Sequence, residues 1–253
     1  MAHQSRHSSW PLLRAVSLWM CAAFCSAGAG AEPPQEVVNT FDQGRESWQV
    51  YDYNGGIAGG GNVFFLPSWE KTGGGGESGY IWADDSRWRI DTPENPHSIL
   101  AFILYRRWVA LDKEKTAREN EAPRPTGYVK GEELDLREAE ISVYLRGDGL
   151  DLKGAKCYFW VFDSQTGTRW HYTSKPLKVS DGQWGERQTF VLKNDETLWH
   201  RSWSGRPQNP GSLDQVLTGD SYGFSFVGFS EEVTGKFSMD EFQIRLQPQP
   251  KRP

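Results

Sequence analysis

The chain has 253 residues, with 28 Lys and Arg against 33 Asp and Glu, and its formal net charge at pH 7 is −5. An acidic chain without a concentration of basic residues lacks the electrostatic footprint of a nucleic-acid-binding protein, so we expect no nucleic-acid partner. The length fits one β-domain, because all-β sandwiches reach this size as single units.

The N-terminus has the plan of a secretory signal peptide. Arg6 and Arg14 precede an apolar run at residues 15–24, and an A-x-A cleavage pattern ends at Ala31. The apolar run is too short to cross a bilayer as a stable helix, although an uncleaved anchor is the alternative. We therefore expect residues 1–31 to be removed, leaving a secreted protein, periplasmic or extracellular, without a transmembrane segment.

Cysteine usage excludes a disulfide framework. Cys21 and Cys25 lie in the expected signal peptide, so Cys157 is the one cysteine of the mature chain. It stands in a strongly apolar run and is expected to be a core residue instead of a nucleophile. No set of Cys and His residues has metal-ligand spacing.

After a short linker at residues 32–36, the sequence predicts one domain over residues 37–247 and a tail at 248–253. Short runs rich in aromatic and β-branched residues alternate with turn residues, which is the signature of strands. The expected strands outside the central block are residues 37–41, 49–53, 98–109, 221–229 and 235–246.

Two glycine-rich stretches, residues 55–61 and 73–76, are expected to be flexible loops at the edges of sheets. Gly74, Gly76 and Gly79 have G-x-G-x-x-G spacing. Neither stretch ends in Gly-Lys-Ser/Thr or opens an amphipathic helix, so a phosphate-binding loop is not indicated. The charged residues 112–125 lack apolar periodicity and are expected to form a solvated loop.

The central block, residues 134–192, organises the rest of the chain. It contains four expected strands, at residues 134–145, 156–162, 168–173 and 187–192. Turn residues separate them, including Arg-Gly-Asp-Gly at 146–149. Strands at this spacing predict an all-β, antiparallel β-sandwich of the jelly-roll type, with long irregular loops and little helix.

Several stretches resemble known β-sandwich families. Residues 75–81, continuing through Trp88 and Pro93, resemble the opening of the laminin IV (laminin B) domain. Residues 136–145 and 184–192 resemble the middle of jelly-roll carbohydrate-binding modules. The resemblance implies a β-sandwich fold and, for the second family, non-catalytic binding of a polysaccharide or another glycan.

The last strand carries a further resemblance. Residues 238–244 resemble the closing strand of galactose-binding-like β-sandwiches, where an Asp precedes alternating apolar residues. In such modules a structural calcium often joins the first and last strands. The resemblance therefore implies calcium at Asp240, with Asp42 or Glu46 as the second acidic ligand.

Aromatic residues in polar surroundings indicate where a glycan would bind, because rings stack on the C–H faces of sugars. Trp199 and Trp203 lie in a polar segment beside His200 and Arg201. The expected strand at 168–173 has large side chains at both odd and even positions, which point to opposite faces of a sheet. One of these two sets is therefore expected to face solvent. The alternative is that these rings fill the core and seal its ends. The expected ligand-binding residues are Arg169, Trp170, His171, Tyr172, Trp199, Arg201 and Trp203.

An enzyme is the second class of function. Glu133, Asp135 and Glu138 match a Glu-x-Asp-x-x-Glu pattern that resembles the signature of laminarinase-like jelly-roll glycosidases. The simpler interpretation of the same residues is a charged lead-in to a strand, and we favour it. Residues 219–223 fit Gly-x-Ser-x-Gly but lead into a strand instead of a strand-to-helix elbow, and no His follows them. We therefore expect a non-catalytic protein.

A structural or adhesion protein of an envelope or extracellular matrix is the third class, with a cell-surface protein as partner. An exposed apolar patch would favour this class. A surface lined by Trp and polar side chains would favour glycan binding.

Overall fold

The part of the chain that the computed structural model describes comprises residues 36–52, 63–86, 90–92, 95–105, 108–111, 121–122, 125–128 and 134–247. All of these residues belong to one compact unit, residues 33–253. No helix among them is long and apolar enough to cross a membrane.

Some expectations fall outside the described residues. They concern the signal peptide, nearly all of the linker, the glycine-rich residues 55–61, most of the charged segment, Trp88, Pro93, Glu133 and the tail. Cleavage after Ala31 and export of the protein stay predictions.

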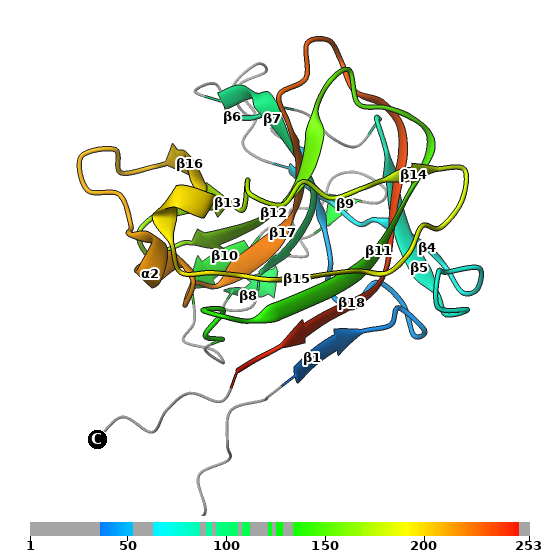
Figure 1. Ribbon diagram of the computed structural model, residues 1–253, viewed down its shortest axis with the longest axis horizontal. Helices are drawn as coiled ribbons and strands as arrows, with labels where there is room; N and C mark the ends of the chain where they lie inside the picture. Colours follow the sequence, from blue (N-terminus) through cyan, green and yellow to red (C-terminus); the bar gives the residue numbers. More distant parts are fainter. Residues whose placement is uncertain are drawn as a thin grey trace, which may run out of the picture. The chain divides into compact units, whose positions relative to one another are not determined.

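The fold is an antiparallel β-sandwich of two large sheets, which confirms the predicted class. Sheet A has seven strands, with β1 beside β18 and β15 beside β11 off the main path. Its strands are, across the sheet, β14 (Ser180–Asp181), β11 (Glu140–Asp151), β18 (Thr234–Arg245), β5 (Tyr80–Asp84) and β4 (Ser68–Glu70), with β1 (Glu36–Asn39) and β15 (Gln188–Val191). Figure 1 shows β1 and β18, the first and last described strands, side by side.

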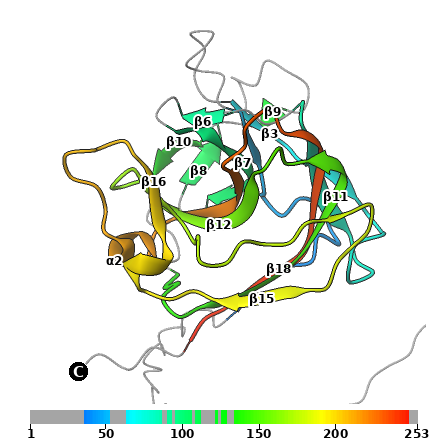
Figure 2. The ribbon, with the colours of Figure 1, turned by 45° about the horizontal axis from the view of Figure 1, so that its top comes forward.

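Sheet B faces sheet A and has six strands. Its strands are β16 (His200–Ser204), β13 (Thr168–His171), β12 (Lys156–Asp163), β17 (Ser221–Val227), β7 (Asn95–Tyr105) and β6 (Ile90–Thr92). In Figure 2 the curved strands β11 and β18 pass to one side of β12. Two small sheets complete the described strands, β2 (Val50–Asp52) with β3 (Val63–Phe65) and β9 (Glu121–Ala122), and β8 (Trp108–Leu111) with β10 (Pro125–Tyr128).

The core lies between the two sheets and follows the period-two pattern of the sequence. On β11 the side chains of Ile141, Val143 and Leu145 are buried, as their common parity predicts. Aromatic rings then join the sheets, because Phe237 of β18 stacks on Phe102 of β7 with ring centroids 5.2 Å apart. Burial of these apolar side chains is the main force that holds the sandwich together.

The four strands expected in the central block are present, but they do not lie in one sheet. Strands β11 and β15 belong to sheet A, and strands β12 and β13 belong to sheet B. The turn expected at residues 146–149 is wrong, because β11 continues through it to Asp151. The long partner strand β18 supplies hydrogen bonds along this stretch. An irregularity in the register between Asp148 and Asp151 accommodates Gly149, which has a φ of 57°.

The glycine-rich residues 73–76 form a close-packed loop over sheet A, not a flexible loop at its edge. The amide of Gly76 donates to Asp240 Oδ2 at 3.1 Å, and Asp240 lies on β18 inside the sheet. A Cβ on Gly75 would lie 2.7 Å from Cγ of the Tyr144 ring. Glycine is therefore required here by close approach to the sheet.

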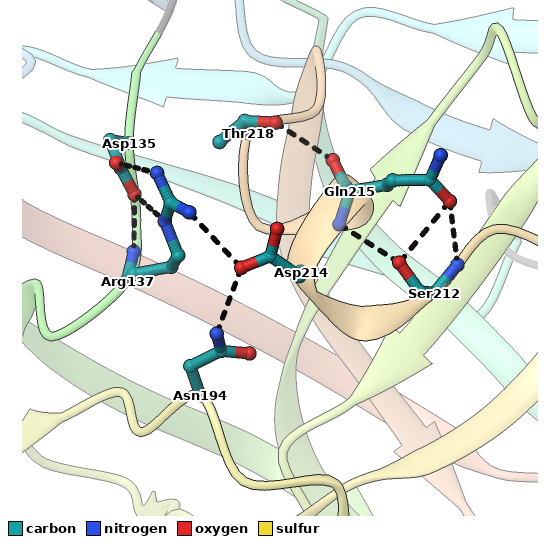
Figure 3. Close-up of polar contacts among 7 residues, drawn as sticks. All are labelled: Asp135, Arg137, Asn194, Ser212, Asp214, Gln215 and Thr218. Carbon is teal, nitrogen blue, oxygen red and sulfur yellow. Dashed lines mark hydrogen bonds and ion pairs between the residues drawn. The ribbon is translucent and has the colours of Figure 1, made fainter.

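Helical structure in the described residues is limited to two short turns. The 3-10 turn η2 covers Glu196–Leu198, and α2 covers Leu213–Val216. Ser212 and Gln215 form a reciprocal capping box at the start of α2 (Figure 3). The short length of both turns agrees with the little helix that the sequence predicts.

Candidate functional site

Strand β13 carries three of the residues expected to bind ligand, Arg169, Trp170 and His171, and places them on two different faces of sheet B. The register pairs His171 with Trp160 of β12, and Trp170 with Val161. Because Val161 faces the core, Trp170 points inward, and Arg169 and His171 point to the outer face of the sheet.

The expected exposure of Trp170, Tyr172 and Trp199 is wrong, since each keeps only 6% of its surface accessible. The indole of Trp199 enters the interior after η2, lies 4.7 Å from the Tyr172 ring and donates to the Lys193 carbonyl at 2.7 Å. Trp170 Nε1 donates to the Gly211 carbonyl. Polar sequence surroundings do not prevent burial here, because backbone carbonyls satisfy the indole N–H groups.

The polar segment that contains Trp203 forms β16, an edge strand of sheet B. Trp203 is half-buried on this strand, and its ring centroid lies 5.9 Å from that of Phe162. Arg201 is exposed, and its guanidinium lies 5.7 Å from the Trp170 ring, away from Phe162. Of the two Trp residues four positions apart, Trp199 is therefore core and Trp203 is surface.

The outer face of sheet B carries four buried polar side chains, those of Trp160, His171, Ser221 and Ser225, which we call the polar row. Trp160 lies between His171 and Gly223 in the register, and the two serines flank Gly223 on β17. A Cβ on Gly223 would lie 2.9 Å from Cζ2 of Trp160, so the indole lies across this glycine.

Five polar atoms of the polar row have no hydrogen-bond partner. They are Trp160 Nε1, both imidazole nitrogens of His171, and the hydroxyls of Ser221 and Ser225. All four side chains are nearly closed to solvent, with exposures of 0–2%. A buried polar group without a partner destabilises a fold by about 1–3 kcal/mol. The concentration of such atoms on one face identifies it as the candidate functional site.

The charge state of His171 follows from this burial. Desolvation lowers the pKa of His171 well below its ordinary value, and the charges of Arg169 and His200 lower it further. The imidazole is therefore neutral at pH 7, with one nitrogen able to donate a hydrogen bond and the other able to accept one.

Half-buried aromatic rings border the polar row. Tyr158 and Phe162 share the outward parity of Trp160 on β12, and Trp203 lies beside Phe162. The outer face of sheet B thus combines accessible rings with hydrogen-bonding atoms farther in. Trp160, Ser221 and Ser225 were missed by the sequence reasoning. A signal for Trp160 was present in residues 156–162, where large side chains occupy both the inward and the outward positions of the strand.

The acidic pattern that resembles a glycosidase signature is held in ion pairs. Asp135 and Asp214 bind Arg137 from opposite sides, and Asp214 also accepts from Asn194 at 2.9 Å (Figure 3). Hydrogen bonds from Arg137 to Asp135 chiefly raise the pKa of the guanidinium. Glu138 pairs with Lys193. These contacts make Asp135 an anchor for α2, and they leave no paired carboxylates free for acid–base work among these described residues.

Ser221 does not have the surroundings of an activated nucleophile. It is the first residue of β17, and its buried hydroxyl has no hydrogen-bond partner. The serine of Gly-x-Ser-x-Gly enzymes stands on a sharp strand-to-helix turn.

The acidic residues implied for calcium are bound by protein donors. Asp240 accepts from the Gly76 amide, the Ser78 hydroxyl and the Glu241 amide, and burial raises its pKa. Asp42 accepts from the Gly79 amide at 3.3 Å. Within the described ranges, no three acidic, His or Cys side chains gather to hold a metal ion. A calcium ion at Asp240 would have to displace these donors, so the contacts do not fit the calcium site that the resemblance implies.

No protein-family model and no curated protein sequence matches the chain. Solved structures of low sequence identity are similar to it. An exo-β-agarase is 12% identical with a TM-score of 0.41, over 87% of this chain and 26% of the agarase. A family 11 carbohydrate-binding module from Clostridium thermocellum, bound to a mixed-linked β-1,3-1,4 tetrasaccharide, is 12% identical with a TM-score of 0.34 and covers 85% of this chain and 98% of the module.

The L4b domain of human laminin α2 is 5% identical with a TM-score of 0.39, over 85% of this chain and 98% of the domain. The module and the laminin domain are the two kinds of domain that stretches of the sequence resemble. The chain spans only about a quarter of the agarase. At these identities and TM-scores, the likenesses assign no ligand to this chain.

Proposed function

We propose that the protein is a secreted, non-catalytic module that binds a glycan on the outer face of sheet B. Rings of Phe162 and Trp203 at the border would stack on the C–H faces of the sugar. The polar row would then exchange hydrogen bonds with its hydroxyls. The observation that carries the proposal is the set of five unpartnered polar atoms on this one face.

The chemistry of the polar row suits a hydroxyl-rich ligand better than a charged one. Trp160 Nε1 can only donate, and the serine hydroxyls and the neutral imidazole of His171 can both donate and accept. A sugar hydroxyl also donates and accepts, so one sugar residue can satisfy several of these atoms. Small numbers of placed polar groups beside aromatic surfaces are typical of ligand sites.

Protein binding is less well supported. Extended apolar patches mark protein-interaction surfaces. Among the residues whose burial the structure describes, which exclude residues 63–65 and 108–111, Val38 at 49% exposure is the one large hydrophobic residue that is exposed. Secretion is proposed on the N-terminal signal pattern.

A glycan array followed by titration of the strongest oligosaccharide tests the proposal. Trp203→Ala should weaken binding about fivefold, because one aromatic contact contributes about 1 kcal/mol. Arg201→Ala is the matched control, since Arg201 is exposed on the same strand but lies over Trp170, and it should bind as the wild type does.

Equal binding by the wild type and Trp203→Ala, with both variants folded, would contradict the proposal. So would the absence of any array signal from a folded, monodisperse wild-type protein.

A further inference from the structure

The outer face of sheet A, on the opposite side of the sandwich, carries a second group of aromatic rings. Tyr80 and Trp82 stand on β5, Tyr144 on β11, and Trp184 in the connection between β14 and β15. All four are half-buried. We call these four residues the aromatic face.

Two contacts fix the rings of Tyr80 and Trp184 in the aromatic face. Trp184 Nε1 donates to the Gly73 carbonyl at 2.7 Å, which joins loops from the two sides of sheet A. The Tyr80 and Trp184 rings meet edge to face with centroids 5.4 Å apart. The rings are therefore held in place before any ligand arrives, which reduces the loss of conformational freedom on binding.

Each indole of the aromatic face has a cation beside it. Lys236 Nζ lies 4.8 Å from the Trp82 ring, and the Arg146 guanidinium lies 5.9 Å from the Trp184 ring. Asp148 holds both cations, since it accepts from Arg146 Nε at 2.9 Å and lies 3.3 Å from Lys236 Nζ. Ion pairs of this partly exposed kind contribute little to stability, so a ligand can displace a cation from a ring at small cost.

A buried hydroxyl lies in the middle of this arrangement. Ser238 of β18 stands between Trp82 and Arg146 in the register, and its neighbours Phe237 and Met239 face the core. Its side chain is fully buried and its hydroxyl has no hydrogen-bond partner. Asp148 Oδ2 likewise receives no hydrogen bond. Between two indole rings, this face thus presents a hydroxyl without a hydrogen-bond partner and a carboxylate oxygen whose contact is the ion pair with Lys236.

We propose that the aromatic face is a second carbohydrate site, for an uncharged sugar residue. One hydroxyl of the sugar accepts from Ser238, a neighbouring hydroxyl donates to Asp148 Oδ2, and the ring stacks on Trp82. An uncharged ligand is favoured because Arg146 and Lys236 are already paired with Asp148, and Asp84 stands opposite Lys236 on β5. An anionic sugar would meet both carboxylates.

Two sites on opposite outer faces would make the module bivalent. Each face can then hold a different glycan chain, or two segments of one chain. This inference goes beyond the proposed function of sheet B and does not depend on it, because the two faces share no residue.

The test uses the full-length mature protein, labelled with 15N at the Trp indoles, and three probes: cellohexaose, maltohexaose and the anionic hexagalacturonate. At least one neutral hexamer should shift the indole signals of Trp82 and Trp184. Ser238→Ala should weaken this response about fivefold without lowering the melting temperature. Ser142→Ala is the matched control, because this hydroxyl lies on the same face but has a partner, Gln243 Oε1 at 3.3 Å.

The inference is overturned if no neutral hexamer shifts these signals, if Ser238→Ala and Ser142→Ala respond alike, or if hexagalacturonate binds more tightly than both neutral hexamers. Trp203→Ala separates the two sites. It should weaken the response of sheet B about fivefold and leave the Trp82 and Trp184 shifts unchanged, so failure of either site is recognised independently of the other.

Discussion

The outer faces of the two sheets differ in how their polar side chains are paired. On sheet A, most polar side chains pair with one another, and the rings of Trp82 and Trp184 remain half-accessible beside Lys236 and Arg146. On sheet B, Trp160 and His171 are closed to solvent, yet their polar atoms have no partners. The first face is complete without a ligand except at Ser238 and Asp148, whereas the second leaves most of its polar atoms unused.

This difference shows why exposure alone is a poor guide to a binding site. The candidate site on sheet A would be found by searching for accessible aromatic rings. Sheet B would be found only by accounting for hydrogen bonds, because most buried polar groups in proteins are satisfied and each exception requires an explanation. Substitutions in the interior, on sheet B and on sheet A should therefore differ in their effects on stability and on binding.

The largest expected effect concerns Trp199, which lies inside the sandwich. Trp199→Ala removes a ring that packs on Tyr172 and should lower the free energy of unfolding by about 3–5 kcal/mol. Trp203→Ala, four residues away on the outer face, should lower it by about 1 kcal/mol or less. Urea denaturation of both variants measures the contrast, and equal losses would mean that Trp203 is also a core residue.

The next effect is the pH dependence of stability caused by His171. Its pKa is lower in the folded protein than in the unfolded chain, so below about pH 6.5 the unfolded chain binds more protons. The contribution of neutral His171 is therefore complete above about pH 6.5 and is lost as the pH falls toward the folded pKa, with a slope of up to about 1.4 kcal/mol per pH unit.

His171→Phe provides the control for this prediction. Denaturation between about pH 8 and pH 5 should show a smaller decline for the variant than for the wild type. Asp220 and Asp240, whose pKa values burial raises, act in the opposite direction, because their folded forms bind protons more readily. Equal slopes for wild type and variant would mean that His171 has a partner or solvent access.

Calcium is expected to have the smallest effect. The Asp240 carboxylate already accepts hydrogen bonds from Gly76, Ser78 and Glu241. A ligand that binds only the folded state raises the thermal midpoint, so the midpoint should be the same in calcium and in chelator. An increase at saturating calcium would support the site that the resemblance implies and would require these donors to move.

The sequence predicts the sandwich well because period-two alternation records which side of a strand is buried. Ile141, Val143 and Leu145 carry this signal, and the same signal in residues 235–246 predicts β18. The division of the central block between two sheets was not predicted, because strand pairing depends on contacts distant in the chain. The turn expected at 146–149 fails for the same reason, since Gly147 in this stretch pairs with Phe237 of β18.

The candidate site was predicted only in part. Arg169 and His171 lie on the outer face, and Trp203 lies at its border, whereas Trp170, Tyr172 and Trp199 belong to the interior. Polarity of the surrounding sequence suggested exposure, but backbone carbonyls of Lys193 and Gly211 allow the indoles to be buried. Unpartnered atoms such as the Ser225 hydroxyl are a property of the fold and leave no pattern in the sequence.

Ser225→Ala tests the central claim most directly, because it removes one unpartnered hydroxyl from the polar row and almost no volume. The two measurements are the free energy of unfolding and the affinity for the strongest array oligosaccharide. An unused buried hydroxyl predicts unchanged or higher stability, with binding weakened about fivefold by the loss of about 1 kcal/mol. Lower stability together with unchanged binding would show that Ser225 serves the fold and not a ligand, and would contradict the account of sheet B.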